Sequence, residues 1–555
     1  MRGDSMKKWF NQNKWFLITI FFLSLLMVYF INQKQGFHED EIFSYGSSNY
    51  HYDNVYRPYG YAEASQDVFY HQVWNSKNKI SNIKNFILNY DSFTEDEVLS
   101  KEIPIFRKKE EAIQYLTIHT GDALNYFSVY YNQARDVHPP LFYFLVHFVS
   151  TIFYGRFSKY IIFTINLTFF IGTLWVIKKI TEKLNMEKLT IPTLILYGAS
   201  MGCISTVMFQ RMYMMLTFFS VLYFYLTIKF IQDDFKIEKN YPWILTILFG
   251  FLTQYYFCIY IVLVFLFVSI YLLIKKEYQK LGHYFSLHVI AALIGILFYP
   301  VSIYHIFFSY RGLDGVEQTK SIIQNLIYYF NQIYKLFGMN HLLLLLIILY
   351  FILIIQNKIK IDHKKLFYCG FIFFPIFIYL FIVAKIAPFL GENYTSRYIM
   401  LLFPIISIGI AYLFHLATQK KIFFWIISIL LSINGLYCNE PVYLYKDYQK
   451  VMDIAEKYQE DYFVYVYDNS FTHLSSLPEF ATYKASLIIN KNNYDFSLLE
   501  NDELKNSNEF ILCVKNWLDV DDILNRVLTG SHYTKYEKIL ELKSDVESTY
   551  YKIIK

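Results

Sequence analysis

The sequence is poor in charged residues. Only 17% of its 555 residues are Asp, Glu, Lys or Arg, whereas 55% are hydrophobic and 21% are aromatic. The apolar residues form many uninterrupted runs, which a soluble protein of this length would not contain. The composition therefore indicates a polytopic membrane protein. Its formal net charge of +5 requires no nucleic-acid partner, and we expect none.

Cysteine is also scarce, and its spacing excludes two kinds of site. The five cysteines show neither the spacing of a metal site nor a disulfide framework. Three of them lie within apolar runs, where a free cysteine packs as a small hydrophobic residue. The cysteines are Cys203, Cys258, Cys369, Cys438 and Cys513.

Eleven apolar runs are candidate membrane spans. The first, Trp15 to Ile31, follows Lys7, Lys8 and Lys14 and ends without a small-residue cleavage site, which predicts a retained span and not a signal peptide. The others are Tyr160 to Ile177, Thr190 to Phe209, Met212 to Ile231, Tyr241 to Phe257, Cys258 to Ile274, His288 to Phe308, His341 to Ile355, Leu366 to Val383, Tyr398 to Leu416 and Ile422 to Leu436.

A twelfth run, Leu141 to Tyr154, is too short to span comfortably, because its 14 residues rise only about 21 Å as a helix. The positive-inside rule decides its role. If it does not cross, the short inner segments hold 20 Lys and Arg residues and the short outer segments hold 6. If it crosses, 12 lie inside and 16 outside. We therefore expect eleven spans and a re-entrant or interfacial helix.

This topology predicts a cell-membrane protein with a cytoplasmic N-terminus and two large outer parts. Residues 1–436 would form the membrane domain, with a long first outer loop at 32–159, and residues 437–555 an extracytoplasmic α/β domain. In the latter, Asp461 to Asn469 and Glu509 to Asn516 read as strands, with helices such as Tyr448 to Gln459 and Val520 to Leu528 between them. It has no glycine-rich phosphate loop, which favours binding or assembly over catalysis there.

Acids and cations gather at the expected outer face. "GFHEDEIFSY" places Asp40 and Glu41 just beyond the first span, and "RDVHPPLFYF" places Asp136 and His138 before the re-entrant helix. Solvated helix ends are the simpler interpretation of the first cluster, because spacing alone does not require a bound ligand. Arg and Tyr at outer turns offer a forked phosphate donor and an aromatic face, although both also anchor proteins at interfaces. These residues are Arg211, Tyr213, Arg397 and Tyr398.

Taken in order, these motifs resemble the protein mannosyltransferase and aminoarabinose transferase superfamily, enzymes of the glycosyltransferase family 39 type with the GT-C fold. The most specific piece is "HPPL" after a long first outer loop. The resemblance covers roughly Trp15 to Leu436. It rests on "DE" (Asp40, Glu41), "D-x-HPPL-x-Y" (Asp136, His138, Pro139, Pro140, Leu141, Tyr143), "R-x-Y" (Arg211, Tyr213) and a late "RY" before a proline-containing span (Arg397, Tyr398, Pro404).

The resemblance implies an all-α membrane domain that transfers a sugar from a polyprenyl phosphate to an extracytoplasmic glycan, lipid or protein. Asp40 takes the role of the base, with Glu41 beside it. The lipid phosphate or the acceptor would be held by Asp136, His138, Arg211 and Arg397, with Tyr213 and Tyr398 alongside.

The sequence departs from this pattern at two places. Ile162 stands near a position where many family members have Arg, so Lys159 substitutes or the phosphate is held differently. Gln254 stands where a His is common.

No cofactor is implied. A divalent ion could bind Asp40 and Glu41, but no further acid follows at ligand spacing, so we expect no obligatory metal.

Two other functions fit the same topology. A transporter of polyprenyl-linked glycans, or a non-catalytic assembly partner, would also have many spans and charged outer loops. A transporter should carry charged residues in the middle of several spans, and here the mid-span positions are almost wholly apolar. A ligase or polymerase of lipid-linked glycans would differ mainly in donor size.

Overall fold

The computed structural model describes residues 2–52, 59–61, 102–104, 106–307, 322–357, 363–387, 393–467, 471–490, 499, 502–543 and 547–555. Of the expected long loop at 32–159, residues 53–58, 62–101 and 105 therefore lie outside the described residues. The chain divides into two compact units. The first, called here the membrane unit, comprises residues 1–32, 137–142 and 162–442, and the second, called the α/β unit, comprises residues 33–136, 143–161 and 443–555.

Seven helices in the described residues are long and apolar enough to cross a membrane, or eight if a bent pair counts as one span. The protein is therefore a multi-span helical membrane protein. The seven segments lie in α1 (Arg2–Gln33), α7 (Lys159–Lys183), α10 (Tyr213–Gln232), α12 (Tyr256–Ile274), α13 (Tyr278–Phe298), α18 (His363–Ile386) and η5 with α19 (Asn393–Leu402 and Phe403–Ala417).

The bent pair occupies the expected span Thr190 to Phe209. Residues Glu187–Gly198 and Met201–Met208 form helical segments that meet at an angle of 59°. The second segment begins as a separate helix, with Ser200 as its N-cap. The Ser200 hydroxyl accepts a hydrogen bond from the Cys203 backbone N–H at 3.1 Å. The helices of this pair are η4 (Glu187–Leu189), α8 (Thr190–Gly198) and α9 (Met201–Met208).

Shorter helices occupy the remaining apolar runs. Apolar helices of 10 to 17 residues occur at Leu141–Ile152, Tyr241–Phe251, Leu344–Gln356 and Ile422–Cys438. The first of these is α6, at the run expected to be re-entrant. Besides the long helices and the bent pair, the membrane unit contains α11 (Tyr241–Phe251), α14 (Ser302–Phe307), α16 (Ile322–Leu336), α17 (Leu343–Asn357) and α20 (Ile422–Cys438).

One expected span is displaced along the chain. The sequence predicts a helix at His288 to Phe308, whereas α13 runs from Tyr278 to Phe298 and ends before Pro300. Proline disfavours a helical conformation for the residue before it, so the helix stops near Tyr299. The predicted span was misplaced because the apolar run extends past Pro300, whereas the helix ends before it.

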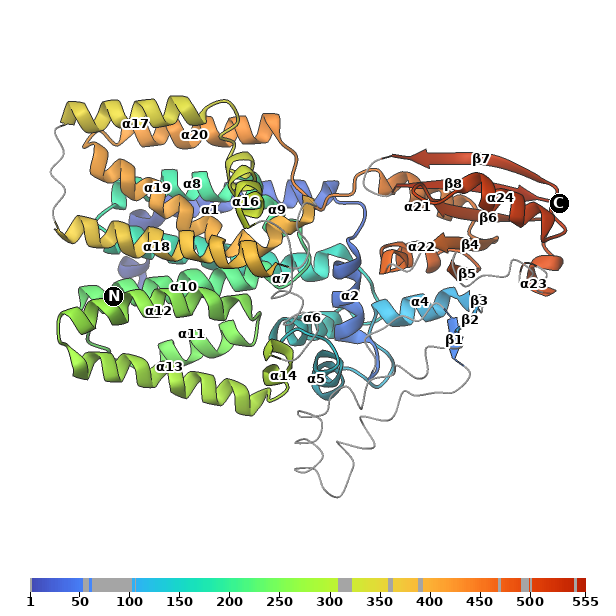
Figure 1. The fold of residues 1–555 in the computed structure, drawn as a ribbon, viewed down its shortest axis with the longest axis horizontal. Helices are drawn as coiled ribbons and strands as arrows, with labels where there is room; N and C mark the ends of the chain where they lie inside the picture. Colours follow the sequence, from blue (N-terminus) through green and yellow to red (C-terminus); the bar gives the residue numbers. More distant parts are fainter. Residues whose placement is uncertain are drawn as a thin grey trace, which may run out of the picture. The chain divides into compact units, whose positions relative to one another are not determined.

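Aromatic and polar contacts join the membrane helices to one another. In Figure 1, α11 lies between α12 and α13, and α18 lies beside α12. Phe224 of α10 stacks on Phe371 of α18 at a centroid distance of 4.8 Å. The Tyr223 hydroxyl of α10 lies 2.7 Å from Nε2 of His288 and 2.9 Å from the Tyr284 hydroxyl, both on α13. These three polar side chains are thus bonded to each other.

The α/β unit contains helices from the long loop and a sheet built mostly from the C-terminal part of the chain. Its loop elements are α2 (Glu39–Asn49), β1 (Tyr59–Tyr61), β2 (Glu102–Pro104), β3 (Phe106–Lys108), α4 (Lys109–Leu116) and α5 (Tyr126–Ala134), and most of α6 (Leu141–Ile152) belongs to it too. The C-terminal helices are α21 (Tyr448–Lys457), η6 (Phe471–Ser476), α22 (Leu477–Phe480), α23 (Asp502–Lys505) and α24 (Val520–Thr529).

The sheet has six strands in the order β3-β5-β4-β6-β8-β7, most of which can be followed in Figure 1. Strand β4 pairs in parallel with β5 and β6, whereas β3, β8 and β7 are antiparallel to their neighbours. Strands β4 and β6 lie where the sequence predicts strands, and β3 comes from the long loop. The C-terminal strands are β4 (Tyr462–Tyr467), β5 (Ala485–Asn490), β6 (Glu509–Lys515), β7 (Lys535–Leu542) and β8 (Ser548–Ile554).

Both faces of the central strands are covered, which explains the continuous apolar run "YFVYVY" of β4. Alternate side chains point to opposite faces. Val464 and Val466 share a core with Ile523 and Leu524 of α24. On the other face the ring of Phe463 stacks on that of Tyr483, 4.4 Å between centroids, next to α22.

This second face encloses a buried carboxylate. Glu479 of α22 is fully buried, and its two oxygens accept hydrogen bonds from the hydroxyls of Tyr448 at 3.1 Å and Tyr550 at 3.0 Å. Burial raises the pKa of Glu479 from 4.5 to about 6, because the charged form is desolvated.

Because the folded state holds this proton more tightly than the unfolded state, the stability that Glu479 contributes is present below pH 4.5 and is lost as the pH rises through 6. We predict that the free energy of opening of β4 and β6 falls by about 2 kcal/mol across this interval. Hydrogen exchange of the full-length protein in detergent, corrected for intrinsic rates, measures it. Glu479→Gln should remove the dependence, whereas Glu503→Gln, an exposed control, should retain it. If the opening free energy of wild type and of Glu479→Gln depended on pH in the same way, Glu479 would not be the group responsible.

Candidate functional site

The N-terminus of α2 carries the acids that follow the first span. Nδ1 of His38 accepts a hydrogen bond from the backbone N–H of Asp40 at 3.0 Å, and the Glu41 carboxylate accepts one from the His38 N–H at 2.7 Å. This reciprocal arrangement is a capping box, which satisfies two N–H groups at the helix start. Three acids in the first turn also complement the helix dipole. The helix therefore begins at a defined residue.

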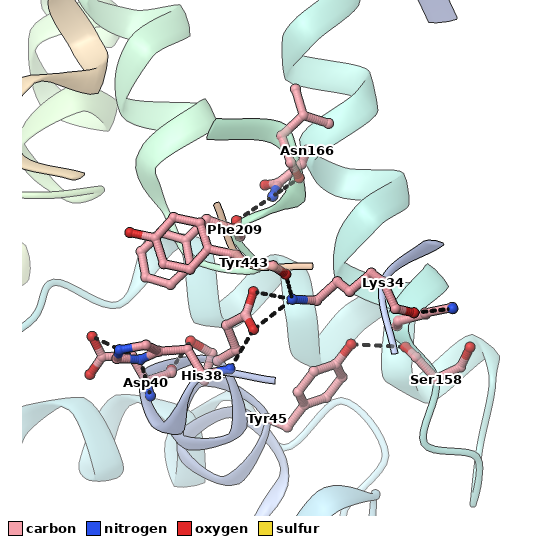
Figure 2. A network of polar contacts seen from close by, with 12 residues as sticks. Lys34, His38, Asp40, Tyr45, Ser158, Asn166, Phe209 and Tyr443 are labelled. Carbon is pink, nitrogen blue, oxygen red and sulfur yellow. Dashed lines mark hydrogen bonds and ion pairs between the residues drawn. The ribbon is translucent and has the colours of Figure 1, made fainter. Parts of the chain in front are cut away.

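Glu41 is buried in an ion pair with Lys34. Nζ of Lys34 lies 3.0 and 2.8 Å from the two carboxylate oxygens and 2.5 Å from the carbonyl oxygen of Tyr443, and neither charged side chain is exposed (Figure 2). Three acceptors meet the three protons of the ammonium. Charges can be buried when they are paired and hydrogen-bonded in this way.

Asp40 has a different environment from its neighbour. Its side chain is 27% exposed, and its Oδ2 lies 3.8 Å from Nδ1 of His38. Since that nitrogen accepts the Asp40 N–H, the proton of a neutral His38 is assigned to Nε2. Asp40 therefore presents a carboxylate that solvent reaches, on a backbone that the capping box and the Glu41 ion pair hold.

The segment before α7 lies against the same region. The Lys159 ammonium donates a hydrogen bond to the carbonyl oxygen of Lys34, and the Tyr45 hydroxyl donates one to that of Ser158 at 2.8 Å. The Phe157 ring lies 5.0 Å from that of Phe37. Lys159 therefore lies beside the residues that lead into α2.

Asp136 and His138 share one motif but belong to different units. Asp136 is partly buried just after α5, where its backbone N–H donates to the Gln133 carbonyl at 3.0 Å. Pro139 and Pro140 directly precede α6, which begins at Leu141. In the membrane unit the Leu141 N–H donates to the Leu252 carbonyl at 3.0 Å. The motif is therefore anchored through its backbone.

His138 and Arg211 form a buried pair in the membrane unit. Nη2 of Arg211 lies 3.3 Å from Nε2 of His138, and the two residues are 2% and 6% exposed, respectively. Guanidinium can only donate, so Nε2 accepts and His138 is neutral with its proton on Nδ1. The Tyr299 hydroxyl donates to the His138 carbonyl at 3.3 Å. His138 is thus one hydrogen-bond partner of the Arg211 guanidinium.

Arg397 and Tyr398 lie among tyrosines of the same unit. Nη2 of Arg397 donates to the Tyr398 hydroxyl at 3.4 Å, and the guanidinium lies 5.2 Å from the ring centroid. The Tyr379 hydroxyl donates to the Tyr398 carbonyl at 2.9 Å. The Tyr398 ring lies 5.2 Å from that of Tyr256. Arg397 and Tyr398 therefore lie among aromatic side chains.

Sequence reasoning missed Lys34 and Tyr443. A lysine at the end of an apolar span normally reaches back to the interface, so nothing local predicts its burial. Its carbonyl partner is 409 residues away. Within the part of the chain that the structure describes, no group of three or more His, Cys, Asp or Glu side chains is arranged to hold a metal ion.

No family model matches the chain, and no curated protein matches it in sequence. Solved structures of similar fold include the crystal structure of ArnT from Cupriavidus metallidurans bound to undecaprenyl phosphate. The TM-score is 0.50 and the identity is 12%, and the match covers 97% of this chain and 98% of ArnT. At this identity the likeness concerns the fold alone. The chain thus has the fold of ArnT over nearly its whole length, as its resemblance to the GT-C aminoarabinose transferase superfamily implies.

Proposed function

We propose that this protein is a membrane glycosyltransferase that moves a sugar from a polyprenyl phosphate to an extracytoplasmic glycan, lipid or protein. The observation that carries the proposal is a solvent-accessible Asp40 on a helix start fixed by a capping box and a buried ion pair. The fold supports the donor class, because the similar ArnT structure was solved with undecaprenyl phosphate.

In the proposed reaction Asp40 is the general base. An acceptor hydroxyl attacks the anomeric carbon of the donor sugar as its proton passes to the Asp40 carboxylate. The new bond joins the acceptor oxygen to that carbon, the bond from the carbon to the phosphate oxygen breaks, and its electron pair leaves with the polyprenyl phosphate. Attack from the side opposite the leaving group inverts the configuration. A positioned general base contributes about 10² to 10⁴ in rate.

Glu41 supports this base and does not share its role. Its carboxylate is fully buried and committed to Lys34 and to the backbone of His38. It therefore keeps Asp40 in place and keeps the base from being neutralised by Lys34. Asp136 and Lys159 are proposed as further contacts of the acceptor or the phosphate in the same unit.

The leaving phosphate requires cations, and the membrane unit supplies Arg211 and Arg397. Arg211 donates a hydrogen bond to His138, and Arg397 donates one to the Tyr398 hydroxyl. A guanidinium offers a phosphate both a positive charge and a forked set of donors. Tyr213 and Tyr398 add aromatic faces to these positions.

We further propose eleven spans, made of the seven long helices, the bent pair and three of the shorter apolar helices, with the N-terminus in the cytoplasm. The excess of basic residues in the inner segments supports this orientation. It places α2 and the C-terminal sheet outside, where an acceptor would arrive.

The donor and the acceptor can be identified in cells that lack the protein. Mass spectrometry of lipid-linked sugars and surface glycans should find an accumulated polyprenyl-phosphate monosaccharide and a missing decoration. Accumulation of the donor on the inner leaflet alone would instead indicate a transporter.

Asp40→Asn keeps the size and hydrogen bonding of the side chain but removes its basic lone pair. The variant should insert and bind the lipid donor, yet lose turnover by at least about 10² in a purified assay saturated with that donor. Glu39→Gln is the matched control, since Glu39 stands outside the "DE" motif, and its turnover should hardly change. Glu41→Gln should fall between the two. Near-normal transfer by Asp40→Asn would return these acids to the role of a solvated helix end.

Arg211→Ala and Arg397→Ala should each weaken binding of undecaprenyl phosphate about tenfold or more, with expression unchanged. The loss of one hydrogen bond to a charged partner costs about 1.5 to 3 kcal/mol. Arg526→Ala, at an exposed pair with Asp522 in the C-terminal part, is the control. Binding like wild type by both variants would make these arginines membrane anchors.

An impermeant label should reach a tag at Lys555 from outside sealed cells, but not one at Lys183. The same orientation predicts labelling near Gly315 and protection at Asp362, positions that lie outside the described residues. A protected C-terminus would be inconsistent with eleven spans and with outer positions for Arg211 and Arg397.

A further inference from the structure

Residues 34–38, which lead into α2, are held by the first residues of the C-terminal part of the chain. The Tyr443 carbonyl accepts from the Lys34 ammonium at 2.5 Å, and the Gln35 N–H donates to the Leu444 carbonyl at 2.9 Å. The Lys34 ammonium also lies 5.4 Å from the Tyr445 ring centroid. Figure 2 shows Tyr443 beside the Lys34 ammonium, which also donates to Glu41 at 3.0 Å. All these residues belong to the α/β unit.

The backbone of this C-terminal segment is strained. Tyr443 and Tyr445 have φ values of 72° and 46°, in the left-handed region that residues with a Cβ seldom adopt. Such conformations persist only where surrounding structure imposes them, and they cluster at functional sites. Here the strained residue is the one whose carbonyl completes the coordination of the Lys34 ammonium.

The fit between the two segments is also tight. A Cβ added at Gly36 would lie 2.8 Å from Cβ of Tyr448 and 2.9 Å from Cβ of Tyr445. The two segments therefore approach each other more closely than side chains on both would allow.

We propose that the Lys34–Glu41 pair, fixed by the Tyr443 carbonyl, is a positioning device for Asp40, so that sugar transfer depends on the C-terminal part of the chain. The proposal rests on the proposed function of Asp40. Glu41 connects Lys34 to the start of α2, because one of its oxygens accepts hydrogen bonds from both the Lys34 ammonium and the His38 backbone N–H. Asp40 is the residue before Glu41 in this helix, so fixing Glu41 also fixes the backbone of Asp40.

A purely stabilising role would not require charges here. Replacing a buried ion pair by apolar residues of similar volume is often neutral or stabilising, whereas removing one partner leaves an uncompensated buried charge. What the pair provides is geometry, because its hydrogen bonds have fixed directions. Stability and positioning can therefore be separated experimentally.

The first test compares Lys34→Met with the double variant Lys34→Met/Glu41→Met in the full-length protein. The single variant should lower the thermal midpoint markedly, and the double variant should restore most of it. Turnover of the double variant should nevertheless remain about 10²-fold below wild type, the size of loss that misplacement by about 1 Å causes. The donor is the polyprenyl-phosphate sugar isolated from cells that lack the protein.

The double variant should lower kcat and leave KM for the donor within about twofold of wild type, as expected when ground-state binding is intact. The control is Lys552→Met/Glu509→Met, which removes a partly exposed pair 2.8 Å apart between neighbouring strands. It should change neither kcat nor KM. A stable double variant with wild-type kcat would overturn the proposal.

The second test uses one position and does not depend on the stability of the ion-pair variants. Tyr443→Gly accepts the left-handed conformation and keeps the carbonyl in place, whereas Tyr443→Val disfavours it, and both lose the ring. Turnover should be at least about tenfold higher in the glycine variant than in the valine variant. Equal turnover of the two variants would show that the carbonyl does not position Asp40.

Hydrogen exchange of the segment around residues 34–45 completes the test. Exchange should be faster in Tyr443→Val and in the double methionine variant than in Tyr443→Gly. Failure of the proposed function gives a different result, because Asp40→Asn would then retain turnover. If Asp40→Asn is inactive while the double methionine variant is fully active, only the positioning role is wrong.

Discussion

The buried pair of Lys34 and Glu41 is the constraint on which the candidate site depends. Desolvation of each ion costs several kcal/mol, and only close pairing with further hydrogen bonds offsets it. Here every proton of the ammonium has an acceptor, and Glu41 also caps α2. Movement of residues 34–41 would leave a charge unpaired, at a cost of about 3 to 5 kcal/mol. Asp40 is thereby held in place, although its own side chain is partly exposed.

The membrane unit also buries charged side chains, but it solvates them in a different way. Arg211 and Arg397 are buried, and the hydrogen bonds that define them here go to His138 and to the Tyr398 hydroxyl. A buried guanidinium needs hydrogen-bond acceptors, and in a medium of low dielectric its charge acts strongly on nearby groups.

Sequence patterns predict the parts of this protein that depend on local order. Apolar length marks the long spans, and β-branched and aromatic runs mark β4 and β6. The same patterns misplace α13, because hydropathy does not register that Pro300 ends a helix. They also cannot join Lys34 to Tyr443 across 409 residues or β3 to β5, since pairing over such distances is decided by tertiary packing. The sequence predicts Asp40 and Glu41 as site residues, but it does not predict that Lys34 forms an ion pair with Glu41.

The distribution of polarity argues for chemistry over transport. Within the described part of the membrane unit, several polar side chains on the long helices bond to one another, as Tyr223, His288 and Tyr284 do, or to backbone carbonyls, as Asn166 does. A transport path needs polar groups that exchange their partners for a passing solute. The accessible carboxylate of Asp40 instead stands on a short helix outside the long spans, with a backbone that is fixed before any substrate binds. Preorganisation of this kind lowers the activation barrier of a chemical step, whereas the conformational changes of a transporter do not require it.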